Sequence, residues 1–422
     1  MTFWQKLKTV FGDKFIRRKI FFVLFILIIF RLLATVPIPG VDIFRLQGFL
    51  EDNQFLNLLN IFSGGGLSAL SLVMMGVGPY ITASIIMQLA TLMSPRLKSL
   101  YHEEGAAGRL KFSQYSRVLT VPLAIIQGYA LISILTQQGV MQALSAYEMA
   151  VALIVVAAGS MFLTWLGDLI SERGIGNGVS VIIFAGIVAG FPAQINQLIF
   201  AYDPTQLLTY IGAALVSVAL IAGIIVVTEA ERLLPITYAK QARAGGVMSA
   251  SSSYLPLRIN QAGVMPVIFA LSILLFPQLL ANFFAAAESG TLQSIAASIN
   301  WFLQTVWLYS VVYFLLVFLF TYFYTAITFD PEAVATNLQK NGAFVPGIRP
   351  GVSTTEYIGK IVSRITFMGA IFLGVIAVLP VVMQQATGIS TLAIGGTALL
   401  IIVSVIIDIL KKLDGQVSMR QY

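Results

Sequence analysis

Long apolar runs recur along the whole chain and are separated by shorter polar segments. A helix that crosses the hydrocarbon core of a bilayer needs about 20 mostly apolar residues. Ten stretches fit this requirement, and the predicted spans cover residues 20–36, 72–93, 118–136, 150–168, 179–199, 208–228, 260–280, 304–325, 364–383 and 392–410. The pattern therefore predicts an all-α polytopic membrane protein.

The composition supports a membrane protein and excludes several kinds of site. The 422 residues are 58% hydrophobic and 10% charged, whereas soluble globular proteins carry about 25% charged residues. Cysteine is absent and His102 is the single histidine, which excludes disulfides and thiolate chemistry and argues against a histidine-held metal. The sequence has no P-loop, nucleophile elbow or paired catalytic carboxylates. We therefore expect neither a cofactor nor enzymatic activity.

The net charge of +7 would suggest a nucleic-acid partner in a soluble protein, but the placement of the charges changes that interpretation. With ten spans, 23 of the 25 Lys and Arg residues fall on one side of the membrane. The exceptions are Arg31, inside the first span, and Arg45. Because cytoplasmic loops carry an excess of Lys and Arg, both termini are predicted to be cytoplasmic.

The spans also suggest two halves. Five spans in each half would make the second half enter the membrane in the opposite direction, as in an inverted repeat. The predicted organisation is a cytoplasmic tail over 1–19, an N-terminal half over 20–200, a C-terminal half over 201–410 and a tail over 411–422.

Two cytoplasmic loops, about 229–259 and 326–363, are much longer than the rest. Long loops often carry function, and the Pro and Gly residues of Gly342–Gly351 predict a rigid turn that holds Arg349 outward. Their charges alone favour ordinary solvated loops, but their length and turn chemistry indicate docking surfaces for something large and acidic.

A glycine-rich segment, Phe62–Ser71, separates the first two spans. It is too short to span a membrane and too apolar to favour water. Irregular backbone at membrane depth persists only where it is buried in protein or lines a water-filled cavity. We interpret the segment as a re-entrant element, although periodicity alone leaves a flexible external linker nearly as open.

Charged residues are rare inside the spans. We interpret Arg31 as structural, with its head group near water, and Asp168 and Asp408 as interfacial. Ser84 and Gln88 share one helical face and can bond a neighbouring helix, by contacts worth roughly 0.6 kcal/mol each. Such contacts fit either a seam that opens or ordinary interhelical packing.

Six motifs occur in order along the chain: Pro37–Gly40, Phe62–Gly65, Pro79–Ile86, Glu172–Gly178, Ala262–Pro266 and Gly342–Gly351. Together they resemble the SecY/Sec61-alpha family, in its bacterial form, over about residues 20–410. The resemblance implies a protein-conducting channel of the bacterial cytoplasmic (inner) membrane, which passes unfolded secretory polypeptides and releases transmembrane segments into lipid. It also implies two inverted five-helix halves, a central pore and a re-entrant plug helix. The implied partners are SecE, SecG, the SecA motor ATPase, the ribosome, signal sequences with nascent polypeptides, and the lipid bilayer.

The resemblance further implies roles for individual residues. A plug covers about 61–71 and includes Phe62, Ser63, Gly64, Gly65, Gly66, Leu67, Ser68, Ala69 and Leu70. A pore ring consists of Val77, Ile81, Val179, Ile183, Ile268 and Ile401. Polar lateral-gate residues are Thr82, Gln88 and Asn260, and residues that dock SecA or the ribosome are Lys240, Arg243 and Arg349. An aliphatic ring excludes water when empty, so it gates by dewetting and holds no ion by charge.

Two rival hypotheses have other mechanisms. A secondary transporter of a small solute would fit ten spans, but transporters usually place charges near the membrane midplane, and these spans are nearly free of them. An insertase scaffold without an aqueous pore is the second. Solute uptake by the chain in liposomes would identify the first, and ion conductance after deletion of the glycine-rich segment would exclude the second.

Overall fold

The computed structural model describes residues 12–38, 60, 63–102, 104–137, 139–142, 144–200, 207–238, 251–285, 290–387 and 395–418. This part of the chain is mostly helical and divides into two compact units. Unit 1 comprises Met1–Thr209, Leu271–Val306 and Ile401–Tyr422, and unit 2 comprises Tyr210–Ala270 and Trp307–Leu400.

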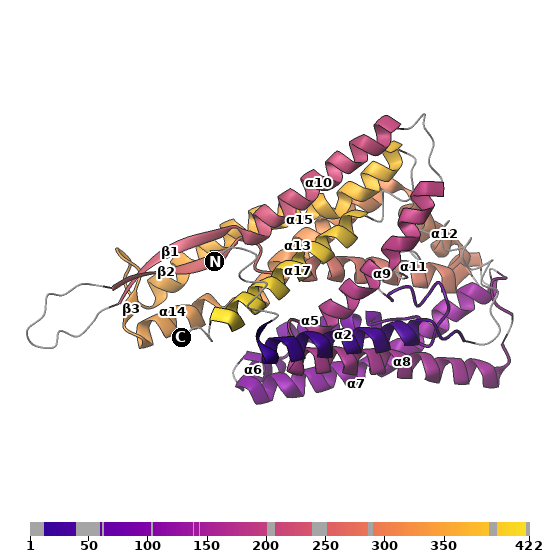
Figure 1. Ribbon diagram of the computed structural model, residues 1–422, viewed down its shortest axis with the longest axis horizontal. Coiled ribbons are helices and arrows are strands. Elements are labelled where there is room, and N and C mark those ends of the chain that lie inside the picture. Colours follow the sequence, from indigo (N-terminus) through magenta and orange to yellow (C-terminus); the bar gives the residue numbers. More distant parts are fainter. Residues whose placement is uncertain are drawn as a thin grey trace, which may run out of the picture. The chain divides into compact units, whose positions relative to one another are not determined.

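Unit 1 is built on helices from the first half of the chain. These are α2 (Lys14–Ala34), α5 (Gly78–Met93), α6 (Pro95–His102), α7 (Gly105–Gln137), α8 (Ala146–Arg173) and α9 (Gly178–Phe200). Helix α7 contacts α5, α6 and α8, and α2 contacts α8 and α9, so these helices form one bundle (Figure 1). Helix α12 (Gly290–Gln304) and the larger part of α17 (Gly395–Ser418) also belong to this unit.

Unit 2 combines long helices with a small sheet. Its helices are α10 (Leu207–Glu229), α13 (Val306–Thr328), α14 (Pro331–Lys340), α15 (Val352–Thr387) and the start of α11 (Met265–Ala285). Its strands are β1 (Glu231–Tyr238), β2 (Ser251–Arg258) and β3 (Ala343–Phe344). The sheet order is β2-β1-β3, with antiparallel neighbours throughout.

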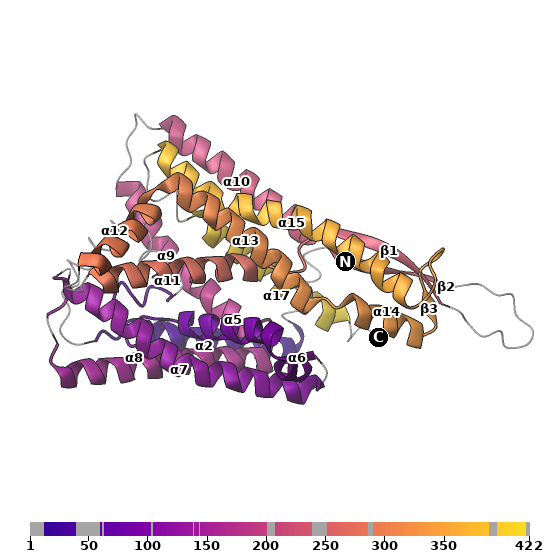
Figure 2. The same cartoon turned by 180° about the vertical axis from the view of Figure 1, so that it is seen from behind.

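The three strands and α14 form what we call the sheet domain, which packs against the first turns of α15 (Figure 2). Alternation along β1 turns Leu234 and Ile236 inward, because successive side chains of a strand point to opposite faces. They join a buried cluster with Leu257 of β2, Val345 and Ile358. This core joins segments from both of the long loops identified in the sequence.

The helical prediction is confirmed in outline. Each of the ten predicted spans overlaps a helix. Five helical stretches of the described residues are long and apolar enough to cross a membrane: Ala107–Thr136, Ala146–Arg173, Tyr210–Glu229, Val306–Lys340 and Val352–Met383. Two shorter apolar helices cover Gly178–Pro192 and Met265–Leu274.

Three details of the prediction are wrong. The chain is not all-α, because the two long loops contain a three-stranded sheet. The second span begins at Gly78 rather than at residue 72, since Gly76 adopts a φ of +56° and Pro79 occupies the first helical turn. The expected plug helix is also absent from residues 63–70, which form consecutive turns.

Candidate functional site

The most unusual part of unit 1 is the non-helical stretch Ser63–Val77, which we call the turn segment. Gly64 and Gly65 adopt φ values of +71° and +81°, in the left-handed region that glycine populates without a steric penalty. Short hydrogen-bonded turns follow, such as Leu70 N–H to the Leu67 carbonyl at 3.0 Å. Two left-handed residues in succession prevent a continuous helix here, so the segment bonds locally instead.

Side chains complete the hydrogen bonding of its first turns. The Ser63 hydroxyl donates to the Asn60 carbonyl at 2.9 Å and accepts from Leu67 N–H at 3.0 Å. The Asn60 amide oxygen accepts from Ser68 N–H at 2.8 Å, and the Ser68 hydroxyl donates to the Gly65 carbonyl at 2.7 Å. These bonds satisfy backbone groups that a helix would otherwise pair.

The apolar side chains of the turn segment are buried against α7 and α8. The cluster contains Leu67, Leu70, Met74 and Met75 of the segment with Leu131, Ile132, Leu135, Val140, Met141, Ala152 and Val156. The backbone also comes close to α8, because a side chain at Gly159 would collide with the Leu72 carbonyl. The segment is therefore packed into unit 1, and its position at membrane depth stays a prediction.

The end of α2 holds the turn segment at two points. Backbone bonds bridge Pro37 and Ser71, with Ile38 N–H donating to the Leu70 carbonyl at 2.8 Å. Near the start of the segment, Arg31 Nη1 donates to the Gly64 carbonyl at 2.9 Å. The sequence analysis assigned Arg31 only a structural role near water and gave no sign of this partner.

The residues of the predicted pore ring lie on several elements. Val77, directly before α5, and Ile81 on that helix are buried, as are Ile183 on α9 and Ile401 on α17, all in unit 1. Val179 is half-buried, beside Gly167 of α8. Ile268 is buried in unit 2. The ring as a whole stays a prediction.

A tight turn between α8 and α9 fixes the start of the helix that carries Val179 and Ile183. Gly176 has a φ of +94°, and the Asn177 side chain accepts hydrogen bonds from Val179 N–H and Ser180 N–H at 3.1 and 3.3 Å. This is the geometry of an N-cap.

The predicted gate residues make few contacts with other helices. Thr82 accepts a long hydrogen bond, 3.4 Å, from the Gln127 amide of α7. Gln88 bonds to Ser84 on its own helix at 3.3 Å, rather than to a neighbouring helix. Sequence analysis missed Gln127; the only available signal was a lone polar residue in an apolar span.

Two of the gate residues carry buried oxygens without partners. Gln88 Oε1 and Asn260 Oδ1 accept no hydrogen bond within the described residues. A buried unsatisfied acceptor costs roughly 1–3 kcal/mol. Both side chains therefore have unused capacity to bind a polar group.

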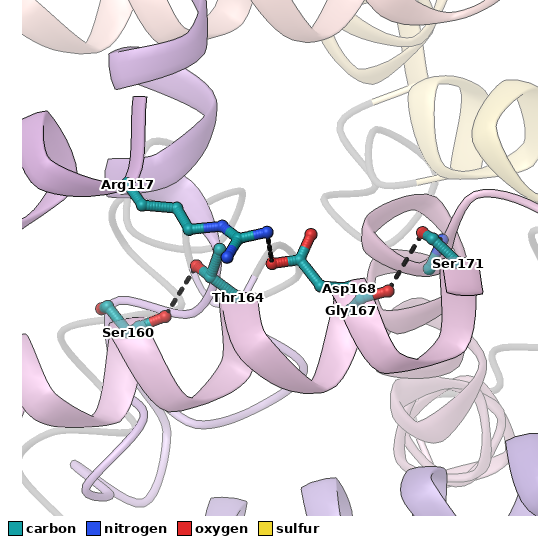
Figure 3. Close-up of polar contacts among 7 residues, drawn as sticks. Arg117, Ser160, Thr164, Gly167, Asp168 and Ser171 are labelled. Carbon is teal, nitrogen blue, oxygen red and sulfur yellow. Dashed lines mark hydrogen bonds and ion pairs between the residues drawn. The ribbon is translucent and has the colours of Figure 1, made fainter. Parts of the chain in front are cut away.

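An ion pair joins α7 to α8, where sequence analysis expected only an interfacial acid. Arg117 Nη2 lies 2.7 Å from Asp168 Oδ2, and Figure 3 shows the carboxylate turned toward the guanidinium. Thr164 and Ser171 bond to carbonyls of their own helix instead, at 2.9 and 3.1 Å. Asp408 pairs with Lys412 along α17 at 2.9 Å.

The predicted docking residues fall in two regions. Arg349 is exposed on the turn after β3, between Gly347 and Gly351 with φ values of +80° and +101°, and its carbonyl accepts from the Thr354 hydroxyl at 3.0 Å. Lys240 and Arg243, like Phe62 of the predicted plug, lie outside the described residues. Within the described ranges, no three His, Cys, Asp or Glu side chains are grouped so that they could hold a metal ion.

Comparisons with known proteins agree over nearly the whole chain. The family model for SecY matches residues 71–410. The protein translocase subunit SecY of Pseudomonas aeruginosa is 40% identical, over 95% of this chain and 91% of that protein. The subunit of the same name from Corynebacterium glutamicum is 37% identical, over 98% and 97%.

Solved structures show the same fold at lower identity. A structure described as a protein conducting channel has a TM-score of 0.62 and 17% identity, over 94% of this chain and 91% of that one. Sec61 in a canine ribosome-channel complex from the endoplasmic reticulum has a TM-score of 0.58 and 16% identity, over the same shares.

Proposed function

The chain belongs to the SecY family, and we propose that it forms the protein-conducting channel of a Sec translocase. In this proposal it passes unfolded secretory polypeptides and releases transmembrane segments laterally into lipid. It hydrolyses nothing itself, and the energy comes from its partners.

The observation that carries this proposal is the buried turn segment directly before α5. Non-helical backbone at membrane depth is tolerated only where protein buries it or water lines it. The segment leads into Val77 and Ile81, two aliphatic residues of the predicted ring. We propose that residues 61–71 act as a plug over this constriction, built from turns where they are described.

The chemistry of the ring supports passage of many different polypeptides. Val77, Ile81, Val179, Ile183, Ile268 and Ile401 offer neither charge nor hydrogen bonds, so a passing chain meets no strong binding site. An empty aliphatic constriction of this kind excludes water and ions by dewetting. We propose that the ring lies between two inverted five-helix halves.

The lateral gate is proposed along α5 and the start of α11. Thr82, Gln88 and Asn260 would border the seam through which apolar segments reach lipid. Their support is the weak Thr82–Gln127 bond and the unsatisfied oxygens of Gln88 and Asn260, since a seam held by few bonds opens at small cost.

The sheet domain is the proposed docking surface. It presents Arg349 on a turn fixed by two glycines, and a guanidinium suits both RNA phosphates and protein carboxylates. We propose SecA and the ribosome as the large partners here, with Lys240 and Arg243 contributing, and SecE and SecG as further subunits. One structural neighbour is a channel in a ribosome complex.

The charge distribution supports the proposed orientation. With ten spans, 23 of 25 basic residues lie on one side, and this asymmetry supports cytoplasmic termini. We propose that the membrane is the inner membrane of a bacterium.

Reconstitution tests the proposal directly. The full chain, with SecE and SecG in liposomes, is supplied with SecA, ATP and a secretory precursor, and protease protection of the precursor is measured. We expect protection that requires ATP and this chain. Uptake of a small solute without any precursor, together with no protected polypeptide, would instead establish the transporter hypothesis.

A further inference from the structure

We infer that Arg31 is a positioning residue, whose guanidinium holds the turn segment in its buried position by donating to the Gly64 carbonyl. The inference rests on the proposed function only in naming the turn segment as the closing element. The hydrogen bond and the packing around it belong to unit 1 alone.

Two consecutive residues of α2, Phe30 and Arg31, contact Gly64. Phe30 is buried, and a side chain at Gly64 would collide with its ring and would lie 3.1 Å from the Gly186 Cα of α9. Arg31 then donates to the carbonyl of the same glycine at 2.9 Å. A side chain at Gly65 would lie 3.4 Å from Arg31 Nη1, an ordinary contact distance, so the space is restricted at Gly64 and not at Gly65.

The hydrogen bond from Arg31 to Gly64 is strong enough to hold the turn segment and can still be broken when the segment moves. Hydrogen bonds from a charged donor are stronger than neutral ones, and this one is made to a backbone carbonyl rather than to a carboxylate. No ion pair of Arg31 with an acid occurs within the described residues. The hydrogen bond therefore stabilises the buried position of the turn segment, and no ion pair has to be broken when the segment moves.

In the middle of the turn segment, the contact at Ser71 is of a different kind. At Ser71 the backbone bridge to Pro37 needs no side chain. Loss of the Arg31 contact should therefore loosen Gly64 and the residues between it and Ser71, while Ser71 itself stays in place. A general loss of stability would loosen both points together.

Cysteine accessibility separates these two outcomes, because the chain contains no cysteine of its own. One reporter is Leu67→Cys, which follows the residues that Arg31 holds. The other is Ser71→Cys, at the position bridged to Pro37. Both positions are buried, and the Ser71 hydroxyl makes no hydrogen bond within the described residues. Each reporter is combined with native Arg31, Arg31→Gln, Arg31→Lys or the control Arg18→Gln, which removes an exposed arginine of the same helix.

The rate of labelling by a water-soluble maleimide is measured in proteoliposomes that contain the whole translocase. Because loss of a charge-assisted hydrogen bond shifts local opening, we expect Arg31→Gln to speed labelling at position 67 roughly tenfold. Labelling at position 71 should stay nearly constant, Arg18→Gln should change neither, and Arg31→Lys should restore most of the protection. Idle ion conductance, which needs no reporter, should rise in Arg31→Gln and not in Arg18→Gln.

An unchanged rate at position 67, an equal rise at both positions or the same rise in Arg18→Gln would overturn the inference. Precursor translocation by the native chain is measured in the same vesicles. If it fails while the labelling pattern holds, the channel proposal fails and the role of Arg31 stands. If translocation succeeds without the labelling pattern, the role of Arg31 alone is refuted.

Discussion

The turn segment and the sheet domain both interrupt the helical pattern, but they form their backbone hydrogen bonds in different ways. The turn segment closes short turns on itself and buries its apolar side chains between helices. The sheet domain pairs strands from distant parts of the chain and keeps Arg349 exposed. The first arrangement suits a chain without access to water, and the second suits a surface that meets a partner.

The largest effect is expected from a charge placed in the core of the sheet domain. Leu234 is 3% exposed and its neighbour Leu233 is 58% exposed, on opposite faces of β1. Leu234→Asp should cost on the order of 4 kcal/mol, because it buries an unpaired carboxylate. Hydrogen exchange of the β1 amides measures the local unfolding.

Leu233→Asp is the matched control and should change the free energy of unfolding by less than about 0.5 kcal/mol. If both substitutions change hydrogen exchange of the β1 amides equally, Leu234 is not in the core of the sheet domain.

The next effect concerns the glycine turn. Gly64→Ala adds backbone strain at a φ of +71° and a collision with Phe30. We therefore expect the free energy of unfolding, measured by thermal unfolding, to fall by roughly 2–4 kcal/mol. Gly139 has a similar φ of +68° but nothing within 4 Å of an added Cβ. Gly139→Ala should therefore cost only about 1–2 kcal/mol, and equal losses would mean that backbone strain alone matters.

A smaller loss of stability is expected when ion pairs of the helices are broken than when the turn segment is strained. The Arg117 and Asp168 side chains are 33% and 21% exposed, so Asp168→Asn should cost about 1–2 kcal/mol, between the values for surface and buried pairs. Asp408→Asn, which breaks a pair at 46% and 45% exposure, should cost about 0.3–0.5 kcal/mol. Thermal unfolding in detergent compares the two, and a larger loss for Asp408→Asn would contradict this ranking.

The smallest effect on stability is expected at Arg349. Arg349→Glu should change the free energy of unfolding by less than about 0.5 kcal/mol and yet weaken SecA-driven export, because it reverses charge on the proposed docking turn. Lys360→Glu makes the same charge change at an exposed position of α15 and should leave export intact. Equal export by both variants would remove Arg349 from the docking surface.

The sequence predicted the helices better than the contacts between them. Each predicted apolar run overlaps a helix, because the bilayer sets the length and composition of a helix that crosses it. The pairing of Thr237 with Phe344 escaped prediction, since neither short strand indicates its distant partner. The hydrogen bond from Arg31 to Gly64 escaped it as well, because periodicity does not report which carbonyl lies within reach of a guanidinium.

The central claim is that a polypeptide passes along the buried aliphatic face of α5. Ile81 and Ile86 provide matched positions on that helix, with exposed fractions of 8% and 41%. A photoreactive side chain at each position is tested against a secretory chain arrested during export. We predict crosslinks from position 81 and few from position 86; labelling at position 86 with none at position 81 would contradict the channel.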